Sequence, residues 1–112
     1  GGDRDKTKRP EMAQIACALS DRVVITSDNP RTEDPEAIIA DIRSGLQPRD
    51  LAKTLTITNR AEAIRTAILT APEGAVILLA GKGHEDYQII GHEKTHFSEK
   101  EIVNETFKLM LQ

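Results

Sequence analysis

The stretch Ala75-Val76-Ile77-Leu78-Leu79-Ala80 is a continuous apolar run, and the turn-forming sequence Pro72-Glu73-Gly74 stands just before it. An uninterrupted apolar run of this length is typical of a parallel strand that is covered on both faces. The run is followed at once by the polar, glycine-containing sequence Gly81-Lys82-Gly83-His84-Glu85. The stretch therefore predicts a central strand of an α/β sheet, with a polar loop at its carboxyl end.

Helices and further strands are predicted to alternate along the rest of the chain. Apolar residues at helical spacing predict helices at 12–19, 35–46, 61–71 and 99–111. Short apolar or alternating stretches predict strands at 22–26, 53–57, 87–90 and 95–97, the last two forming a hairpin around Gly91. Asp34, Asn59 and Ser98 are expected to cap three of the helices. Strands joined by helices form mostly parallel sheets, so we predict one three-layer α/β domain over residues 1–112.

Composition excludes several classes of protein. The 112 residues are 38% hydrophobic and 29% charged, which is ordinary for a folded domain. A net charge of −3 and an aromatic content of 3% argue against a nucleic-acid partner. The single cysteine, Cys17, excludes an internal disulfide, suits a reducing cytoplasm and is expected to be a small buried residue. No apolar run reaches the roughly 20 residues of a membrane span, so we predict a cytoplasmic protein with no membrane partner.

Three polar loops, at residues 1–8, 27–33 and 81–86, are expected at the carboxyl edge of the sheet. Ligands of α/β domains collect at this edge. The first loop belongs there only if a strand precedes Gly1, and the chain begins on a glycine without an initiator Met. We therefore expect a fragment whose first strand is truncated.

The residue types in these loops favour recognition of an amino acid. Asp28-Asn29-Pro30-Arg31 presents an acid, an amide and a guanidinium on a loop that proline stiffens, and such a loop can bind an ammonium and a carboxylate together. A well-made turn leading to the Asp34 cap explains the same residues equally well. Arg4 can hold a carboxylate and Glu85 can accept from an ammonium, although the first loop alone is best explained as a solvated turn.

Two other kinds of site are disfavoured. Residues 81–86 lack the Ser or Thr of a phosphate-binding P-loop and the third glycine of a dinucleotide fingerprint. His84, His92 and His96 have no cysteine among them, and the segment between the last two is predicted to be extended. Structural zinc needs four well-spaced nitrogen or sulfur ligands, so we predict no metal site.

Taken together, the three loops resemble the C-terminal domain of the Mur ligases. The resemblance rests on Gly1-Gly2-Asp3-Arg4-Asp5-Lys6 with Lys8-Arg9-Pro10, on residues 26–31 and on residues 81–88, and it covers essentially the whole chain. More specifically, the chain resembles the ligases that add the third residue of the peptidoglycan stem peptide. It implies a Rossmann-like fold with an apolar strand directly before Gly1. Without that strand we expect an exposed sheet edge or a gap beside the site.

The resemblance also implies a function. The family joins a UDP-sugar-binding domain, a central ATPase domain and a domain like this one, in the bacterial cytoplasm. ATP would phosphorylate the carboxylate of UDP-MurNAc-L-Ala-D-Glu, and the amino group of meso-diaminopimelate would then attack the acyl phosphate to form an amide. ATP and Mg²⁺ would be held mainly by the central domain, which this chain lacks. We therefore expect the chain to recognise the diamino acid and to be inactive alone.

By position, the contacts of the family to meso-diaminopimelate fall on Arg4, Asp28, Asn29, Pro30, Arg31, Gly81 and Glu85. Arg31 is expected to pair with the distal carboxylate, which lysine lacks, and Asp28 and Glu85 suit the distal ammonium. Asp3 and Lys6 resemble residues that approach the nucleotide, although related ligases place a lysine where this chain has Asp5. Lys82 and His84 match the motif, and their roles stay open.

Two further interpretations remain. The chain can be a stand-alone binding module for an amino acid or a nucleotide, or an α/β remnant with neither function. Calorimetry with meso-diaminopimelate, lysine and ATP separates the module from the ligase fragment, because tight binding by the chain alone favours the module and weak or no binding favours a half-site that needs its partner domain. A folate-adding relative is disfavoured by residues 28–31.

Overall fold

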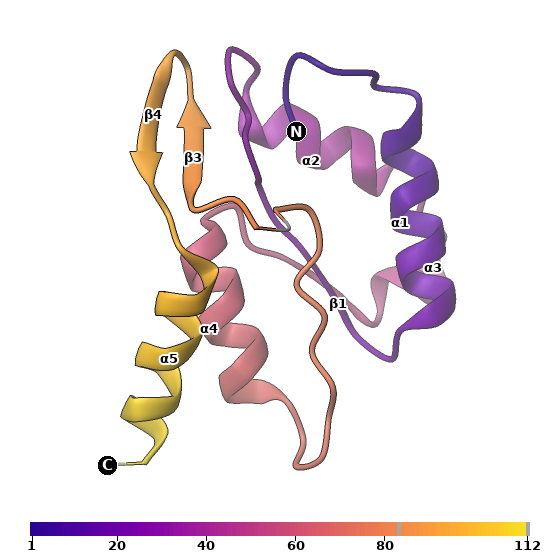
Figure 1. The fold of residues 1–112 in the computed structure, drawn as a ribbon. Coiled ribbons are helices and arrows are strands. Elements are labelled where there is room, and N and C mark those ends of the chain that lie inside the picture. The colour runs from indigo at the N-terminus through magenta and orange to yellow at the C-terminus, as the bar shows by residue number, and fades with distance from the viewer. Residues whose placement is uncertain (83, 112) are drawn as a thin grey trace.

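The structure is a computed structural model that describes residues 1–82 and 84–111. Its elements follow in the order α1 (Lys8–Leu19), β1 (Val23–Ile25), α2 (Pro35–Arg43), α3 (Pro48–Leu51), β2 (Thr54–Thr56), α4 (Arg60–Thr70), β3 (Tyr87–Ile90), β4 (Glu93–His96) and α5 (Glu99–Met110). Helix α1 packs on α2, and α4 packs on α5. These two helical layers lie on either side of β1, which gives the predicted three-layer α/β arrangement (Figure 1).

Local capping sets the beginnings of three helices, as predicted. The side chain of Asp34 accepts from the Glu36 amide, that of Asn59 accepts from the Glu62 amide and that of Ser98 accepts from the Glu101 amide. Each cap satisfies a backbone N–H that has no partner inside its helix. The short helix α3 was not predicted. Pro48 at its first position and reciprocal capping between Gln47 and Asp50 explain why it forms.

Two small sheets are present among the described residues. Strands β1 and β2 run parallel, with Val24 opposite Leu55, as predicted for two strands joined by helices. Strands β3 and β4 form the predicted antiparallel hairpin, and Gly91 takes the positive φ of 62° that its turn requires. The main chain of Arg31 pairs with the hairpin at Ile90, so the loop after β1 is tied to β3.

The prediction of a central strand at Ala75–Ala80 is wrong. These residues are not in a ladder, and Val76 and Leu78 are 96% and 85% exposed. A strand needs a neighbour for its backbone groups, and in the described part of the chain β1 pairs only with β2. Among the described residues the apolar run therefore has neither the ladder nor the cover that the prediction required.

The core is divided between the two helical layers. One cluster consists of Ile64 and Ile68 on α4 with Ile102 on α5. On the other side, α1 buries Arg9, Ala13 and Cys17, which confirms the prediction for the cysteine. The predicted apolar stripe of α1 points away from the core, since Met12, Ile15 and Leu19 are more than half exposed. No described helix combines the length and the apolar character needed to cross a membrane.

Candidate functional site

The three predicted loops come together at one edge of the molecule. We call residues 1–8 loop 1, residues 27–33 loop 2 and residues 81–86 loop 3. Loop 1 lies beside loop 2 at the amino terminus (Figure 1). There the amide of Gly2 donates to the carbonyl of Asn29 over 2.7 Å, and Nη1 of Arg31 donates to the carbonyl of Gly2 over 2.9 Å. Loops 1 and 2 therefore form one continuous surface.

A glycine at position 2 makes this contact possible. A Cβ on Gly2 would stand 1.7 Å from the carbonyl oxygen of Pro30, and Pro30 is itself fully buried. No side chain fits at that distance from a fixed backbone. The close approach of loop 1 to loop 2 therefore depends on Gly2.

The carboxylate of Asp3 is held by loop 2. The hydroxyl of Thr32 donates to Asp3 Oδ1 over 2.6 Å, and the Thr32 amide donates to Oδ2 over 3.3 Å. The hydrogen bond from the Thr32 side chain is the main reason why the pKa of Asp3 lies below its ordinary value. Asp3 has a positive φ of 57°, so its backbone is strained where the two loops meet. Arg4 and Lys6, the other charged candidates of loop 1, are exposed.

Two buried arginines, Arg9 and Arg60, hold the loops in place, and sequence analysis assigned no role to either. Nη2 of Arg9 donates to the carbonyl of Gly1 over 2.9 Å and to Oε2 of Glu33 over 3.0 Å. Arg60 donates to the carbonyls of Ser27 and Ala80 and pairs with Glu99 over 2.8 Å. Nothing in the local sequence shows that a guanidinium on an amphipathic helix will be buried, so no signal was available.

Lys82 joins loop 2 to loop 3 from the interior. Its side chain is fully buried, and its Nζ lies 2.7 Å from Asp28 Oδ1, 3.3 Å from Asn29 Oδ1 and 2.7 Å from the carbonyl oxygen of Tyr87. Asp28 Oδ1 is buried and has no well-aligned hydrogen bond, so its contact with Lys82 is an ion pair. Because the ammonium is enclosed, Lys82 holds the loops together and does not face a ligand.

Asn29 and Tyr87 hold the two oxygens of Glu85. Nδ2 of Asn29 donates to Glu85 Oε1 over 3.3 Å, and the Tyr87 hydroxyl donates to Oε2 over 3.2 Å. Asn29 is 3% exposed, and its Oδ1 also accepts from the amide of Ile89 over 3.0 Å. The charge of Glu85 is the main reason why the pKa of Tyr87 is raised.

Arg31 and Gly81 complete the site. Arg31 is half-buried and takes a positive φ of 53°. Its Nη1 is engaged by the carbonyls of Gly2 and Asn29, which leaves the remaining guanidinium nitrogens for a ligand. Gly81 has a φ of 117°, and Asp28 Oδ2 lies 3.5 Å from where its Cβ would be. His84 is exposed, and Gly83 of the same motif lies outside the described residues.

A cavity of about 110 Å³ lies where the loops meet the end of β1. Gly1, Asp28, Pro30, Arg60 and Gly81 are among its lining residues. Its lining includes Thr26, which directly follows β1, and Ala80, which directly precedes loop 3.

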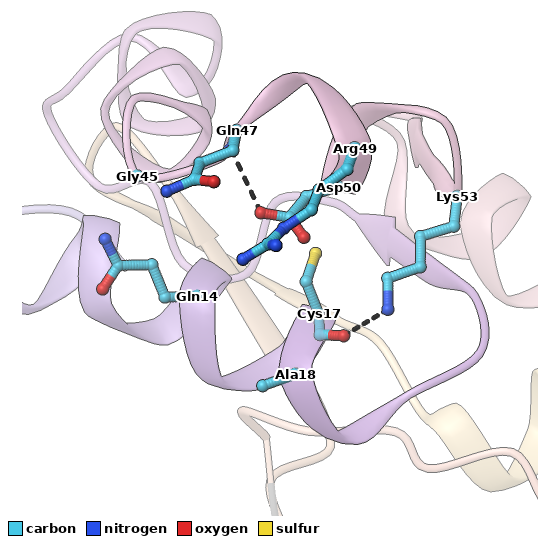
Figure 2. Close-up of a pocket in the computed structure, with 8 residues that line it drawn as sticks. All are labelled: Gln14, Cys17, Ala18, Gly45, Gln47, Arg49, Asp50 and Lys53. Atoms are coloured by element: carbon cyan, nitrogen blue, oxygen red, sulfur yellow. Dashed lines mark hydrogen bonds between the residues drawn. The ribbon is translucent and has the colours of Figure 1, made fainter.

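A larger cavity, of about 460 Å³, lies elsewhere, between α1 and α3 (Figure 2). In Figure 2 Asp50 accepts from the Gln47 amide and Lys53 donates to the carbonyl of Cys17, so two of its polar groups are engaged in the fold. None of the predicted site residues lines it. Among residues 1–82 and 84–111, no three potential metal ligands gather, and His96 instead pairs with Glu101 over 2.9 Å.

Comparison with known proteins identifies a family and individual proteins that are similar to this chain. The family model "Mur ligase, glutamate ligase domain" matches residues 1–83. Two proteins named UDP-N-acetylmuramoyl-L-alanyl-D-glutamate--2,6-diaminopimelate ligase are similar to the chain. The one from Bacteroides thetaiotaomicron is 58% identical, over 96% of this chain and 22% of its own length. The one from Leptospira borgpetersenii is 57% identical, over 97% of this chain and 22% of its own length.

A solved structure of a UDP-N-acetylmuramoyl-L-alanyl-D-glutamate--2,6-diaminopimelate ligase shares the fold. It superposes with a TM-score of 0.93 at 39% identity, over all of this chain and 23% of that one. The chain therefore spans about a fifth of the length of the curated relatives it matches. The match to the family model over residues 1–83 and this superposition establish that the chain belongs to the Mur ligase family, as its C-terminal, Rossmann-like domain.

Proposed function

We propose that the chain is the amino-acid-recognition domain of a ligase that adds meso-diaminopimelate to UDP-MurNAc-L-Ala-D-Glu. The names of its relatives support this substrate pair. The observation that carries the proposal is the placement of Arg31, whose strained backbone turns a partly free guanidinium to the edge where loops 1 and 2 meet.

The charges around this edge match the ends of a diamino dicarboxylic acid. Arg31 belongs to loop 2, and Asn29 of the same loop holds the carboxylate of Glu85. Loops 2 and 3 thus present a guanidinium and a carboxylate from neighbouring segments. Arg31 suits the distal carboxylate as a two-pronged donor, and Glu85 with Asp28 suits an ammonium.

ATP with Mg²⁺ is assigned to another domain of the ligase. Loop 3 has no Ser or Thr after its lysine, and Lys82 is enclosed by protein, so these residues do not fit a triphosphate. Asp3 and Lys6 are the residues of this chain proposed to come near the nucleotide. We propose that this domain supplies the amine to an acyl phosphate formed in the cytoplasm on a central ATPase domain, and that a further domain binds the UDP-sugar.

A strand from outside the described residues is proposed to lie between β1 and residues 75–80 in the complete ligase. The unpaired edge of β1, the exposed side chains of Val76 and Leu78, and the cavity at Gly1 support this position.

The test is Arg31→Ala in the complete ligase. Removing one partner of a hydrogen-bonded ion pair in a binding site costs about 2–5 kcal/mol. We therefore expect the KM for meso-diaminopimelate to rise about 30-fold or more, with a much smaller change in kcat. The substitution keeps the same backbone strain, because alanine and arginine both resist a positive φ.

Arg49→Ala is the matched control, since Arg49 is exposed and lines the larger cavity. Lysine, which lacks the distal carboxylate, serves as the comparison substrate, and its use should not be impaired by Arg31→Ala. An unchanged KM for meso-diaminopimelate would remove Arg31 from the site and the proposal with it.

A further inference from the structure

The carboxylate of Glu85 is held at both oxygens by residues of different segments. Oε1 accepts from Asn29 of loop 2, and Oε2 accepts from the hydroxyl of Tyr87 at the start of β3. Each oxygen of an ionised carboxylate can accept about two hydrogen bonds. Glu85 is therefore fixed in orientation and still able to accept from a ligand.

Tyr87 is itself anchored at three places. Its carbonyl oxygen accepts from the buried Nζ of Lys82 over 2.7 Å, and its backbone pairs with His96 in the hairpin. The ammonium of Lys94 lies 4.0 Å from the centre of its ring. Lys82 also binds Asn29, so a closed ring of contacts runs through Lys82, Asn29, Glu85 and Tyr87. The hydroxyl has little freedom to leave Glu85.

We propose that Tyr87 is a positioning residue that aims the Glu85 carboxylate at an ammonium group of the diamino acid. This role rests on the proposed function of the site. The hydroxyl of Tyr87 donates a hydrogen bond to Oε2 of Glu85, so its role is exerted through Glu85. The negative charge of Glu85 also keeps the phenol protonated, because it raises the pKa of Tyr87 above its ordinary value of 10.0. The donor is therefore present at neutral pH.

The structure offers a spectroscopic test of the contact. Tyr87 is the single tyrosine of the chain, which has no tryptophan, so the alkaline rise in tyrosinate absorbance reports on this residue alone. In Glu85→Gln the phenol should ionise at a lower pH than in the unmodified chain, because the adjacent charge is gone. Circular dichroism at the same pH values verifies that both proteins remain folded.

The functional test is Tyr87→Phe in the complete ligase. Phenylalanine keeps the ring beneath Lys94 and removes only the hydroxyl. Because Glu85 keeps its second donor from Asn29, we expect the KM for meso-diaminopimelate to rise about three- to tenfold, with kcat unchanged. Thr95→Val is the control, since it removes a neighbouring hydroxyl that bonds only to the carbonyl of Gln88.

The outcomes separate this inference from the proposed function. If Glu85→Gln raises the KM and Tyr87→Phe does not, Glu85 binds the ligand without help from Tyr87, and the inference is overturned. If the ionisation of Tyr87 is the same with and without Glu85, the contact is absent and the inference is overturned as well. If Arg31→Ala and Glu85→Gln both leave the KM unchanged, it is the proposed function that fails.

Discussion

Replacing Lys82 by methionine should destabilise the domain more than any substitution of an exposed lysine. Methionine fills the space of the lysine stem and removes only the charge. Asp28 Oδ1, buried 2.7 Å from Nζ, is then left without its counter-ion, and the carbonyl of Tyr87 loses a donor. Breaking a buried ion pair in this way costs about 3–5 kcal/mol. Since the Asp28 side chain is 21% exposed and water reaches part of it, we expect about 2–3 kcal/mol.

Urea unfolding of the chain, followed by circular dichroism, measures this loss. For a domain of this size the urea dependence is about 1–3 kcal/mol per molar, so the midpoint should fall by roughly 1–2 M. Lys100→Met is the matched control, because Lys100 is exposed on α5. Its effect should stay within about 0.5 kcal/mol.

A second variant tests whether the cost comes from the unpaired carboxylate. Lys82→Met combined with Asp28→Asn removes both charges. The loss of unfolding free energy in this double variant should therefore be smaller, by about 1 kcal/mol or more, than the sum of the losses in the two single variants. Simple additivity of the two effects, or a loss below about 1 kcal/mol for Lys82→Met alone, would refute the reasoning.

Two other changes probe loop 1 and the hairpin. Gly2→Ala places a Cβ against the backbone of Pro30 and should lower the free energy of unfolding, measured in urea, by about 1–3 kcal/mol. Gly1→Ala is the control and should be nearly neutral, because its Cβ would meet nothing closer than 3.4 Å. Equal effects of the two substitutions would contradict the close approach of Gly2 to Pro30. The hydrogen bond and the charge of Glu101 raise the pKa of His96 above its ordinary value of 6.5. His96 therefore contributes stability that is fully present below pH 6.5 and is lost as the pH rises through the raised pKa of the folded protein. Proton NMR titration of the ring should show this raised pKa, and Glu101→Gln should abolish it; a His96 titration that ignores the substitution would disprove the pairing.

Features that depend on neighbours in sequence were predictable. Asp34, Asn59 and Ser98 cap their helices because a short polar side chain reaches an amide two or three residues away. The hairpin around Gly91 follows from equally local rules. The strand at 75–80 failed for the opposite reason, since a covered strand requires partners that its own residues do not specify.

The same distinction applies to the site. The predicted convergence of loops 2 and 3 is present in the structure, where Lys82 contacts Asp28, although residues 75–80 do not form the strand on which the prediction was based. The direction in which each polar side chain points could not be predicted. Asn29 and Lys82 turn inward to hold other groups, and Arg9 and Arg60 are buried beneath the loops. Such roles depend on contacts between residues 8 to 56 positions apart in the chain.

The unpaired run at 75–80 has a consequence for handling the domain. Among the described residues this exposed apolar segment belongs to no ladder and β1 pairs with one strand only, and such unpaired segments are templates for strand pairing between molecules. Concentrated samples should therefore self-associate through this region, with Val76 and Leu78 at the contact. A charged residue at either position, such as Val76→Lys, is the simplest way to keep the domain dispersed, and its high exposure means that folding should hardly change.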